Sequence, residues 1–434
     1  MRRSTVTALA TALVLTAGTT AASGETRPTG QDDGALRDVM LVGDNRDGTV
    51  TVVDATDHQP LARIDVIPDR AQRMAEVLSR PDRLAFYLAI RAGIGEGHDQ
   101  FTDDAYTTPD GSLLAVSRPS FADVVGMDLA TGDIVWRFPM EGYRADHMGL
   151  SPDGERLLVS DSTANVVHEL DIRTGTELRT FPSGDTPHEN TYTADGGRVF
   201  HASIGRVYTP VDRPEFGTAY DTLKGEQVFQ VVRTEDMSIE SRWDMGAELA
   251  EAGYPGMASA VRPMALAPDE RFVYLQVSFF HGLVEFDTQA TDPEVTYPGE
   301  PTVGAVRRVV PLPDRTDGLP RELYTLDSAH HGLAIDPTGS TLCAAGTMSD
   351  YAALVDRDTL EHTIVDVGAK PYWTTNGPDG EECWVSVSGD DRVVVIDYDT
   401  AEVVATVPVG DHPQRVRPGV VDPATLTRWA GPVG

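Results

Sequence analysis

The sequence predicts an all-β fold, namely a seven-bladed β-propeller of four-stranded antiparallel blades with helical insertions on one face. The main observation is a tight-turn motif, Pro-Asp-Gly or a close variant, that recurs at positions 109–111, 152–154, 194–196, 268–270, 337–339 and 378–380. A second set of turns recurs at a matching offset, at 130–132, 173–175 and 400–401. Where no insertion intervenes, the spacing is about 42 residues, which is the length of a four-stranded propeller blade.

The C-terminal unit shows the four strands of one blade most clearly. Short β-branched and aromatic runs lie at 371–376, 383–387, 392–397 and 403–409, and turn residues bound each of them. The same order predicts blades at 38–69, 97–142, 143–185, 186–250, 261–314, 327–369 and 370–411. The first unit lacks an innermost strand, and residues 412–422 have the pattern of one. The two ends of the propeller, 38–422, are therefore expected to share one blade, which leaves no free sheet edge.

Size and composition limit the class of protein. About 410 residues remain after a leader is removed. This is more than a single ordinary hydrophobic core contains, unless a repeated architecture distributes the buried residues over several units. A hydrophobic content of 40% with 40 Gly and 29 Pro excludes a disordered chain or a coiled coil. The formal charge of -33 repels phosphate backbones and anionic lipids, so nucleic acid is not an expected partner. The expected partner is a small molecule or a metal, and a monomer is favoured.

The N-terminus has the features of an export signal. Arg2 and Arg3 precede an apolar run at 6–15, and small residues follow up to position 23. This pattern predicts a signal peptide at 1–23, followed by a linker at 24–37, with a tail at 423–434 after the propeller. Because no other apolar run reaches about 18 residues, no transmembrane segment is predicted. We expect a secreted or extracytoplasmic protein.

The two cysteines fall on the second strands of adjacent blades. Cys343 lies four residues after Gly339, and Cys383 lies three residues after Gly380. In an oxidising compartment they can form a disulfide between the blades. The alternative is two buried small hydrophobic side chains, and the sequence leaves both open.

The repeat resembles that of a known family. The run Asp391-Arg392-Val393-Val394-Val395-Ile396-Asp397, followed by 403–410, is similar to the YVTN repeat of YncE-like β-propeller proteins, and the resemblance covers roughly 38–422. It implies an exported seven-bladed propeller and no particular reaction. The fourth and fifth blades depart from the repeat through long insertions.

Strand direction predicts which face carries the chemistry. In a meander, the loops between second and third strands and those between blades lie on one face. These loops are rich in His, Asp, Tyr and Arg, whereas the other face has plain turns. Insertions at 70–96, 204–225, 245–260 and 313–329 belong to the rich face, and 70–96 contains two helical stretches, the second after Pro81. A binding site covered by these insertions is expected there.

Four residues at the start of innermost strands are candidate ligands of one divalent transition metal: Asp104, His147, His188 and His331. Neutral imidazole suits zinc, copper, iron or manganese. Asp146, Glu189 and Asp350 are candidate acceptors that fix the imidazole tautomers. Alternatively, the histidines bond neighbouring loops and line a water-filled funnel.

The spacing of the histidines complicates the metal hypothesis. His147 precedes its turn by five residues, whereas His188 and His331 precede theirs by six. A shift of one residue turns a strand side chain to the opposite face unless a bulge intervenes.

Further residues on the rich face are candidates for ligand binding: Arg118, His201, Tyr208, Arg262, His281, His330, Asp350, Tyr351, Tyr372, Trp373 and His412. Their aromatic rings can stack on a flat ligand or simply pack around loops. His188 or His331 is the candidate general base. The expected function is ligand or metal binding at this face, with a metal-assisted lyase or hydrolase as the alternative and a protein-interaction scaffold as the second alternative.

Overall fold

Runs of about six apolar and small residues, each ended by a turn, form the strands of this protein. The structure is a computed structural model that describes residues 35–206, 224–255, 260–290, 301–302, 304–320, 324 and 328–429. At the tight turns Gly111, Gly154, Gly339 and Gly380 have φ between 63° and 76°, a region in which a side chain is strained. The recurring turns therefore end strands at the same place in each repeat.

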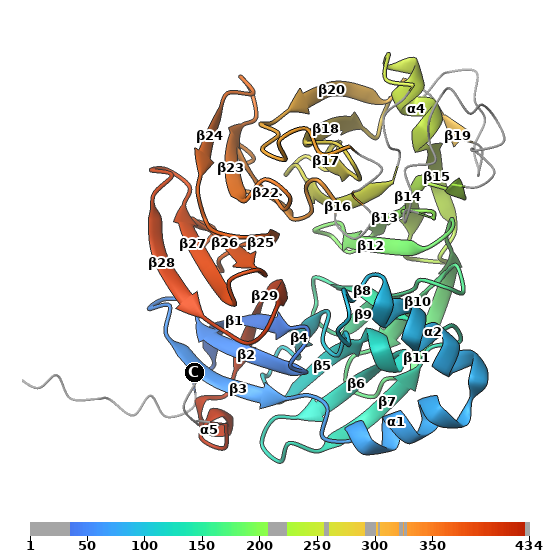
Figure 1. The fold of residues 1–434 in the computed structure, drawn as a ribbon, viewed down its shortest axis with the longest axis vertical. Helices are drawn as coiled ribbons and strands as arrows, with labels where there is room; N and C mark the ends of the chain where they lie inside the picture. The colour runs from blue at the N-terminus through green and yellow to red at the C-terminus, as the bar shows by residue number, and fades with distance from the viewer. Residues whose placement is uncertain are drawn as a thin grey trace, which may run out of the picture. The chain divides into compact units, whose positions relative to one another are not determined.

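Within the described residues the strands form seven antiparallel sheets arranged as a ring (Figure 1). Blade 1 is β29 (Pro413–Val421), β1 (Arg37–Asp44), β2 (Thr49–Asp54) and β3 (Pro60–Asp65); blade 2 is β4 (Ala105–Thr107), β5 (Leu113–Arg118), β6 (Asp123–Asp128) and β7 (Ile134–Pro139); blade 3 is β8 (Ala145–Leu150), β9 (Arg156–Asp161), β10 (Val166–Asp171) and β11 (Glu177–Pro182); blade 4 is β12 (Pro187–Tyr192), β13 (Arg198–Ser203), β14 (Val228–Arg233) and β15 (Ile239–Asp244); blade 5 is β16 (Val261–Leu266), β17 (Phe272–Val277), β18 (Gly282–Asp287) and β20 (Val306–Pro311); blade 6 is β21 (Leu333–Ile335), β22 (Thr341–Gly346), β23 (Tyr351–Asp356) and β24 (His362–Val365); blade 7 is β25 (Pro371–Asn376), β26 (Glu382–Val387), β27 (Arg392–Asp397) and β28 (Val403–Pro408). The seven-bladed β-propeller predicted from the repeat is confirmed.

Blade 1 joins the two ends of the chain. Strand β29 pairs antiparallel with β1, with Arg37 opposite Val421 and Leu41 opposite Arg417. Blade 4 gains a fifth strand, since β19 (Pro301–Thr302) pairs parallel with β15. The innermost strands of neighbouring blades contact one another around the ring, which places their side chains along one central channel.

Apolar side chains fill the space between neighbouring blades. Between blades 6 and 7, Leu354 and Val385 are buried together with Cys343 and Cys383. The two cysteines form a disulfide, with their Cα atoms 6.5 Å apart. Of the two alternatives left open by the sequence, the structure shows the disulfide.

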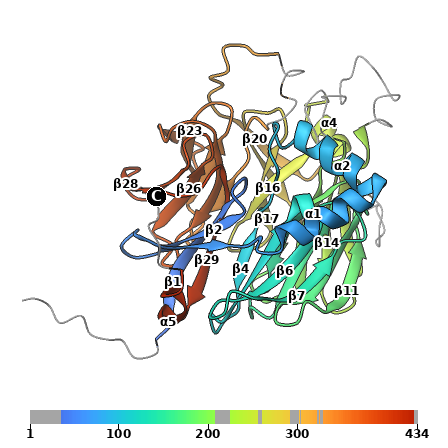
Figure 2. The same cartoon turned by 60° about the horizontal axis from the view of Figure 1, so that its bottom comes forward.

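Helices are few among the residues that the structure describes. The segment between blades 1 and 2 forms α1 (Arg70–Ser79) and α2 (Pro81–Ala92), which lie side by side in both views (Figure 1 and Figure 2). Both contact the short helix η1 (Pro119–Phe121), and α2 begins at Pro81, a residue favoured in the first helical turn. Two further helices are α4 (Met245–Glu251) and α5 (Pro423–Leu426).

Several predicted segments fall partly or wholly outside the described residues. These are the leader at 1–23, most of the linker at 24–37, residues 207–223 of one insertion, and parts of 245–260 and 313–329. In the part of the chain that the structure covers, no helix has the length and apolar character needed to cross a membrane.

Candidate functional site

A β-bulge recurs at the start of the innermost strands. The pairing register shifts between Ala145 and Met148 in β8, and between Pro187 and Asn190 in β12. Corresponding shifts occur in β16, β25 and β29. A bulge releases two consecutive residues from strict alternation between the two faces. Histidines that differ by one position in the repeat can therefore reach the same channel.

Three histidines from three blades gather in this channel. His147 lies on β8, His188 on β12, and His331 just before β21. Each offers a ring nitrogen, and these atoms all lie within 4.8 Å of one another. The rings of His147 and His188 are 3.7 Å apart between centroids, and His331 lies 5.9 Å from His188. All three side chains are buried, so a cation held there would be shielded from water.

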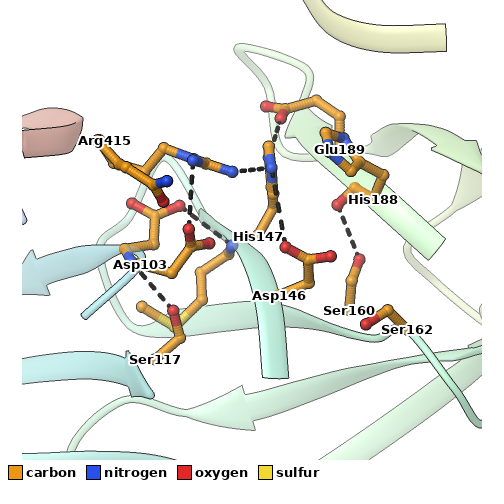
Figure 3. Close-up of polar contacts among 12 residues, drawn as sticks. Asp103, Ser117, Asp146, His147, Ser160, Ser162, His188, Glu189 and Arg415 are labelled. Atoms are coloured by element: carbon orange, nitrogen blue, oxygen red, sulfur yellow. Dashed lines mark hydrogen bonds and ion pairs between the residues drawn. The ribbon is translucent and has the colours of Figure 1, made fainter. Parts of the chain in front are cut away.

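Two contacts determine which ring nitrogen of His147 carries the proton and which carries the lone pair (Figure 3). Its Nδ1 lies 2.5 Å from Glu189 Oε2, and the Arg415 guanidinium donates a hydrogen bond to its Nε2. Burial raises the pKa of Glu189 to about 8 against the opposing effect of the Arg417 charge. Because the guanidinium can only donate, Nε2 holds the lone pair, and the proton of the neutral ring lies on Nδ1, toward Glu189.

The other two histidines differ in their hydrogen-bond partners. Nδ1 of His188 has no hydrogen-bond partner among the described residues, whereas the backbone of Tyr372 acts as a weak partner of the His331 ring. Burial lowers the pKa of all three imidazoles well below its usual value, and the nearby arginine charges lower it further. The rings are therefore neutral at pH 7. Buried polar atoms normally have a partner, so the Nδ1 of His188 is available to bind a ligand.

Carboxylates border the histidine group on one side. Asp103 and Asp146 form, with His147, a second group whose candidate ligand atoms lie within 4.8 Å of one another. Asp146 binds Arg144 at 2.8 Å. Asp104, which the sequence predicted as a ligand, instead binds both nitrogens of the Arg417 fork at 2.8 Å and accepts a hydrogen bond from the Met148 backbone. It is not part of either group.

A cavity of about 630 Å³ occupies the other end of the channel. Its wall consists of innermost strands and tight-turn residues such as Pro337 and Gly380, and its lining includes Glu189, Trp373 and Arg417. Trp373 also lies 5.7 Å from the His147 ring between centroids. The tight-turn face, which the sequence described as plain, thus has a hollow that leads toward the histidine group.

Three of the predicted ligand-binding residues adjoin the histidines. Tyr372 stacks on His331 with ring centroids 4.0 Å apart, and Trp373 lies under the Arg415 guanidinium at 4.8 Å. The charge of Arg262 contributes to the lowered pKa of His188, which places this arginine near the centre. The aromatic rings therefore form one wall of the site.

Other predicted residues have structural partners away from the centre. Arg118 is fully buried between Asp123 and Asp69, at 2.8 and 2.6 Å, and ties blade 2 to the residue before α1. His201 bonds Ser183 and Asn190, which links blades 3 and 4. These contacts explain both residues without a ligand.

A second cluster lies at blades 5 and 6. His281 bonds Tyr324 at 3.0 Å and Ser349 at 3.2 Å, while His330 bonds Tyr351 at 3.0 Å. The bond to Tyr324 attaches the insertion at 313–329 to blade 5, and the bond to Ser349 joins blades 5 and 6. Asp350 and His412 both have positive φ. The Lys370 backbone amide donates a hydrogen bond to the Asp350 side chain, and the His412 backbone amide donates one to the Asp391 side chain. Tyr208 lies outside the described residues.

Sequence reasoning missed Arg415 and Arg417, which both lie on β29. A signal was present, because Pro413 occupies the same place in its strand as Pro187 and Pro371. The two residues after each proline enter the bulge, so Gln414 and Arg415 correspond to His188 and Glu189. The position of β29 at the far end of the chain hid this correspondence.

The fold and the site together define a class: a seven-bladed β-propeller with buried histidines and carboxylates at the start of its innermost strands. No protein-family model matches this chain, and a search of curated proteins found no match. The functional argument therefore starts from the geometry of the channel.

Proposed function

We propose that this propeller binds one divalent transition metal through His147, His188 and His331 and uses it to hold a small ligand. The observation that carries the proposal is the convergence of three buried imidazoles from three blades, with ligand atoms within 4.8 Å of one another. The unpartnered Nδ1 of His188 adds support, since an unpartnered buried nitrogen is destabilising unless something binds it.

The chemistry of the donors favours such a metal. Neutral imidazole nitrogens bind zinc, copper, iron and manganese, and three protein ligands leave a coordination position open for water or a ligand. The contact between Glu189 and His147 matches the carboxylate–histidine pair that orients metal-binding imidazoles. Nitrogens around a tetrahedral ion are about 3.3 Å apart. The three rings must therefore move inward when the metal binds.

We also propose that the protein is exported and that its helical insertions lie on the face that carries the histidines. The leader pattern at 1–23 and the disulfide between Cys343 and Cys383 support export, because disulfides persist in oxidising compartments. Glu96, which follows α2, bonds Arg46 at 3.0 Å and Lys370 at 2.6 Å, in loops at this end of the propeller. These contacts support a covered site.

Metal analysis tests the proposed function. The protein is purified without an affinity tag, reconstituted with Zn²⁺, Co²⁺ or Mn²⁺, and its bound metal is measured by mass spectrometry. We expect about one equivalent in the wild type and none in a triple His147→Ala, His188→Ala, His331→Ala variant. His201→Ala is the matched control, because His201 is equally buried but bonded on both nitrogens. Absence of metal from the reconstituted wild type would overturn the proposal.

A further inference from the structure

Arg415 occupies the place in the channel where a metal would bind His147. Its side chain is 2% exposed, and its guanidinium donates to the Nε2 of His147. Another nitrogen of the same group lies 3.2 Å from Asp103 Oδ1, and its Nε has no hydrogen-bond partner within the described residues. Arg415 therefore holds the only lone pair of His147 that the metal can use.

A metal and this guanidinium exclude each other at His147. The Nε2 atom has one lone pair, which accepts either a hydrogen bond or a metal. Both groups are cations in a buried site, where like charges repel strongly. Binding of the metal must therefore displace the Arg415 guanidinium from His147 toward the remaining space of the channel.

The charges around the centre show what that displacement requires. In the described residues, four arginines and four carboxyl groups act on the histidine group or on one another: Arg144, Arg262, Arg415 and Arg417, and Asp103, Asp104, Asp146 and Glu189. The guanidinium groups are always charged, so these carboxyl groups leave no surplus of negative charge for a cation to neutralise. A divalent cation adds two positive charges to a buried site, which is costly unless an anion enters with it.

We infer that the ligand of this centre is a small molecule with a carboxylate group, held between the metal and the displaced Arg415 guanidinium. This inference rests on the proposed metal site. A planar guanidinium matches the two oxygens of a carboxylate, and the donor that leaves His147 is then available for one of them. Tyr372 and Trp373 flank Arg415 at 5.4 and 4.8 Å and provide apolar surface for the rest of the ligand.

This arrangement makes metal and carboxylate binding interdependent. The metal releases the guanidinium and adds positive charge, so it increases the affinity for the carboxylate. By thermodynamic reciprocity, the carboxylate increases the affinity for the metal by the same factor. We expect a factor of at least about five, the lower end of typical coupling between two sites.

The test measures anion binding with and without Co²⁺, which reports its ligands through visible absorption. Sodium acetate, succinate and phosphate are titrated at constant ionic strength into the metal-free and the Co²⁺-loaded full chain. We expect acetate or succinate to bind the loaded protein at least about fivefold more tightly and to change the cobalt spectrum. Arg415→Met and Arg415→Lys should keep Co²⁺ but lose this difference, and circular dichroism checks that both fold.

Arg118→Lys is the matched control, because Arg118 is fully buried but binds Asp69 and Asp123, away from the histidine group. It should retain the coupling. If the wild type binds Co²⁺ but no carboxylate, if phosphate alone shows the effect, or if Arg415→Met retains it, the inference is wrong and the metal site stands. If the wild type binds no Co²⁺, the metal site itself is wrong.

Discussion

The contact between Glu189 and His147 determines which nitrogen of the imidazole faces the centre. Glu189 Oε2 lies 2.5 Å from Nδ1, so the proton of the neutral ring stays on that side and Nε2 points to the other histidines. Both groups are buried, which leaves no water to take over this role. A single carboxyl group thus orients a proposed metal ligand without being one itself.

Replacement of Glu189 should therefore weaken metal binding without removing a ligand. We expect Glu189→Gln to lower the affinity for Zn²⁺ by about 10- to 100-fold, since loss of such an orienting carboxylate has effects of this size. Competition with a chromophoric chelator measures the affinity. Glu169→Gln is the control, because Glu169 is also buried but lies on β10 of blade 3 and bonds Tyr192 and Arg179. An affinity within twofold of the wild type would contradict the assigned role.

At the level of single strands, an aspartate at the end of β18 connects three chain segments of blade 5. Asp287 accepts hydrogen bonds from Arg271 and Arg307, each at 2.8 Å, and its side chain is 1% exposed. Burial raises the pKa of Asp287, but the hydrogen bonds from the two arginines outweigh burial and lower it to about 2. The ionised carboxylate is thus part of the folded blade.

The stability of the blade should depend on this charge and on pH. Because the folded-state pKa lies below the ordinary value of 3.8, the contribution is fully present above about pH 4 and disappears as the pH falls through 2. Both arginines are nearly half exposed, so we expect Asp287→Asn to cost about 1 to 2 kcal/mol at pH 7. Urea unfolding measures the difference, which should shrink between pH 4 and pH 2.

The exposed pair of Asp366 with Arg315 provides the comparison for this experiment. Asp366→Asn should change the free energy of unfolding by less than about 1 kcal/mol, because the Asp366 side chain is 79% exposed. Equal effects of the two substitutions on the free energy of unfolding would contradict the stabilising role that we assign to the buried Asp287.

The element scale also shows what the sequence could and could not predict. Tight turns and strand alternation can be recognised in short stretches of sequence. They therefore predicted the propeller and placed His147, His188 and His331 together as candidate metal ligands. The bulges are not local, since a shift in β12 appears only when β13 pairs with it. Without the bulges, the spacing of the histidines is inconsistent with one shared face, and Asp104 is chosen over Asp103 as the candidate metal ligand. Which of two adjacent residues faces the channel depends on that pairing.

At the scale of the whole molecule, a disulfide bond links two neighbouring blades in addition to the backbone. Cys343 and Cys383 are 40 residues apart in the chain and connect blades 6 and 7 next to the blade shared by both ends. Because a disulfide restricts the unfolded chain, its removal should lower the free energy of unfolding by about 2 to 4 kcal/mol. Urea unfolding with and without dithiothreitol measures this loss.

A double Cys343→Ala, Cys383→Ala variant is the control for the reductant. It should show the lower stability in both conditions and no response to dithiothreitol. Detection of two free thiols in the non-reduced wild type would contradict the disulfide.

The strand that closes the propeller also has a consequence for the control of metal binding. Strand β29 carries Arg415 and pairs with β1, from which the other six blades separate it in the chain. All three histidines precede it in the chain. A polypeptide without β29 can therefore present imidazoles to a metal but lacks the arginine that competes for His147. In the proposed site, control of metal binding by Arg415 therefore requires β29 to be paired with β1.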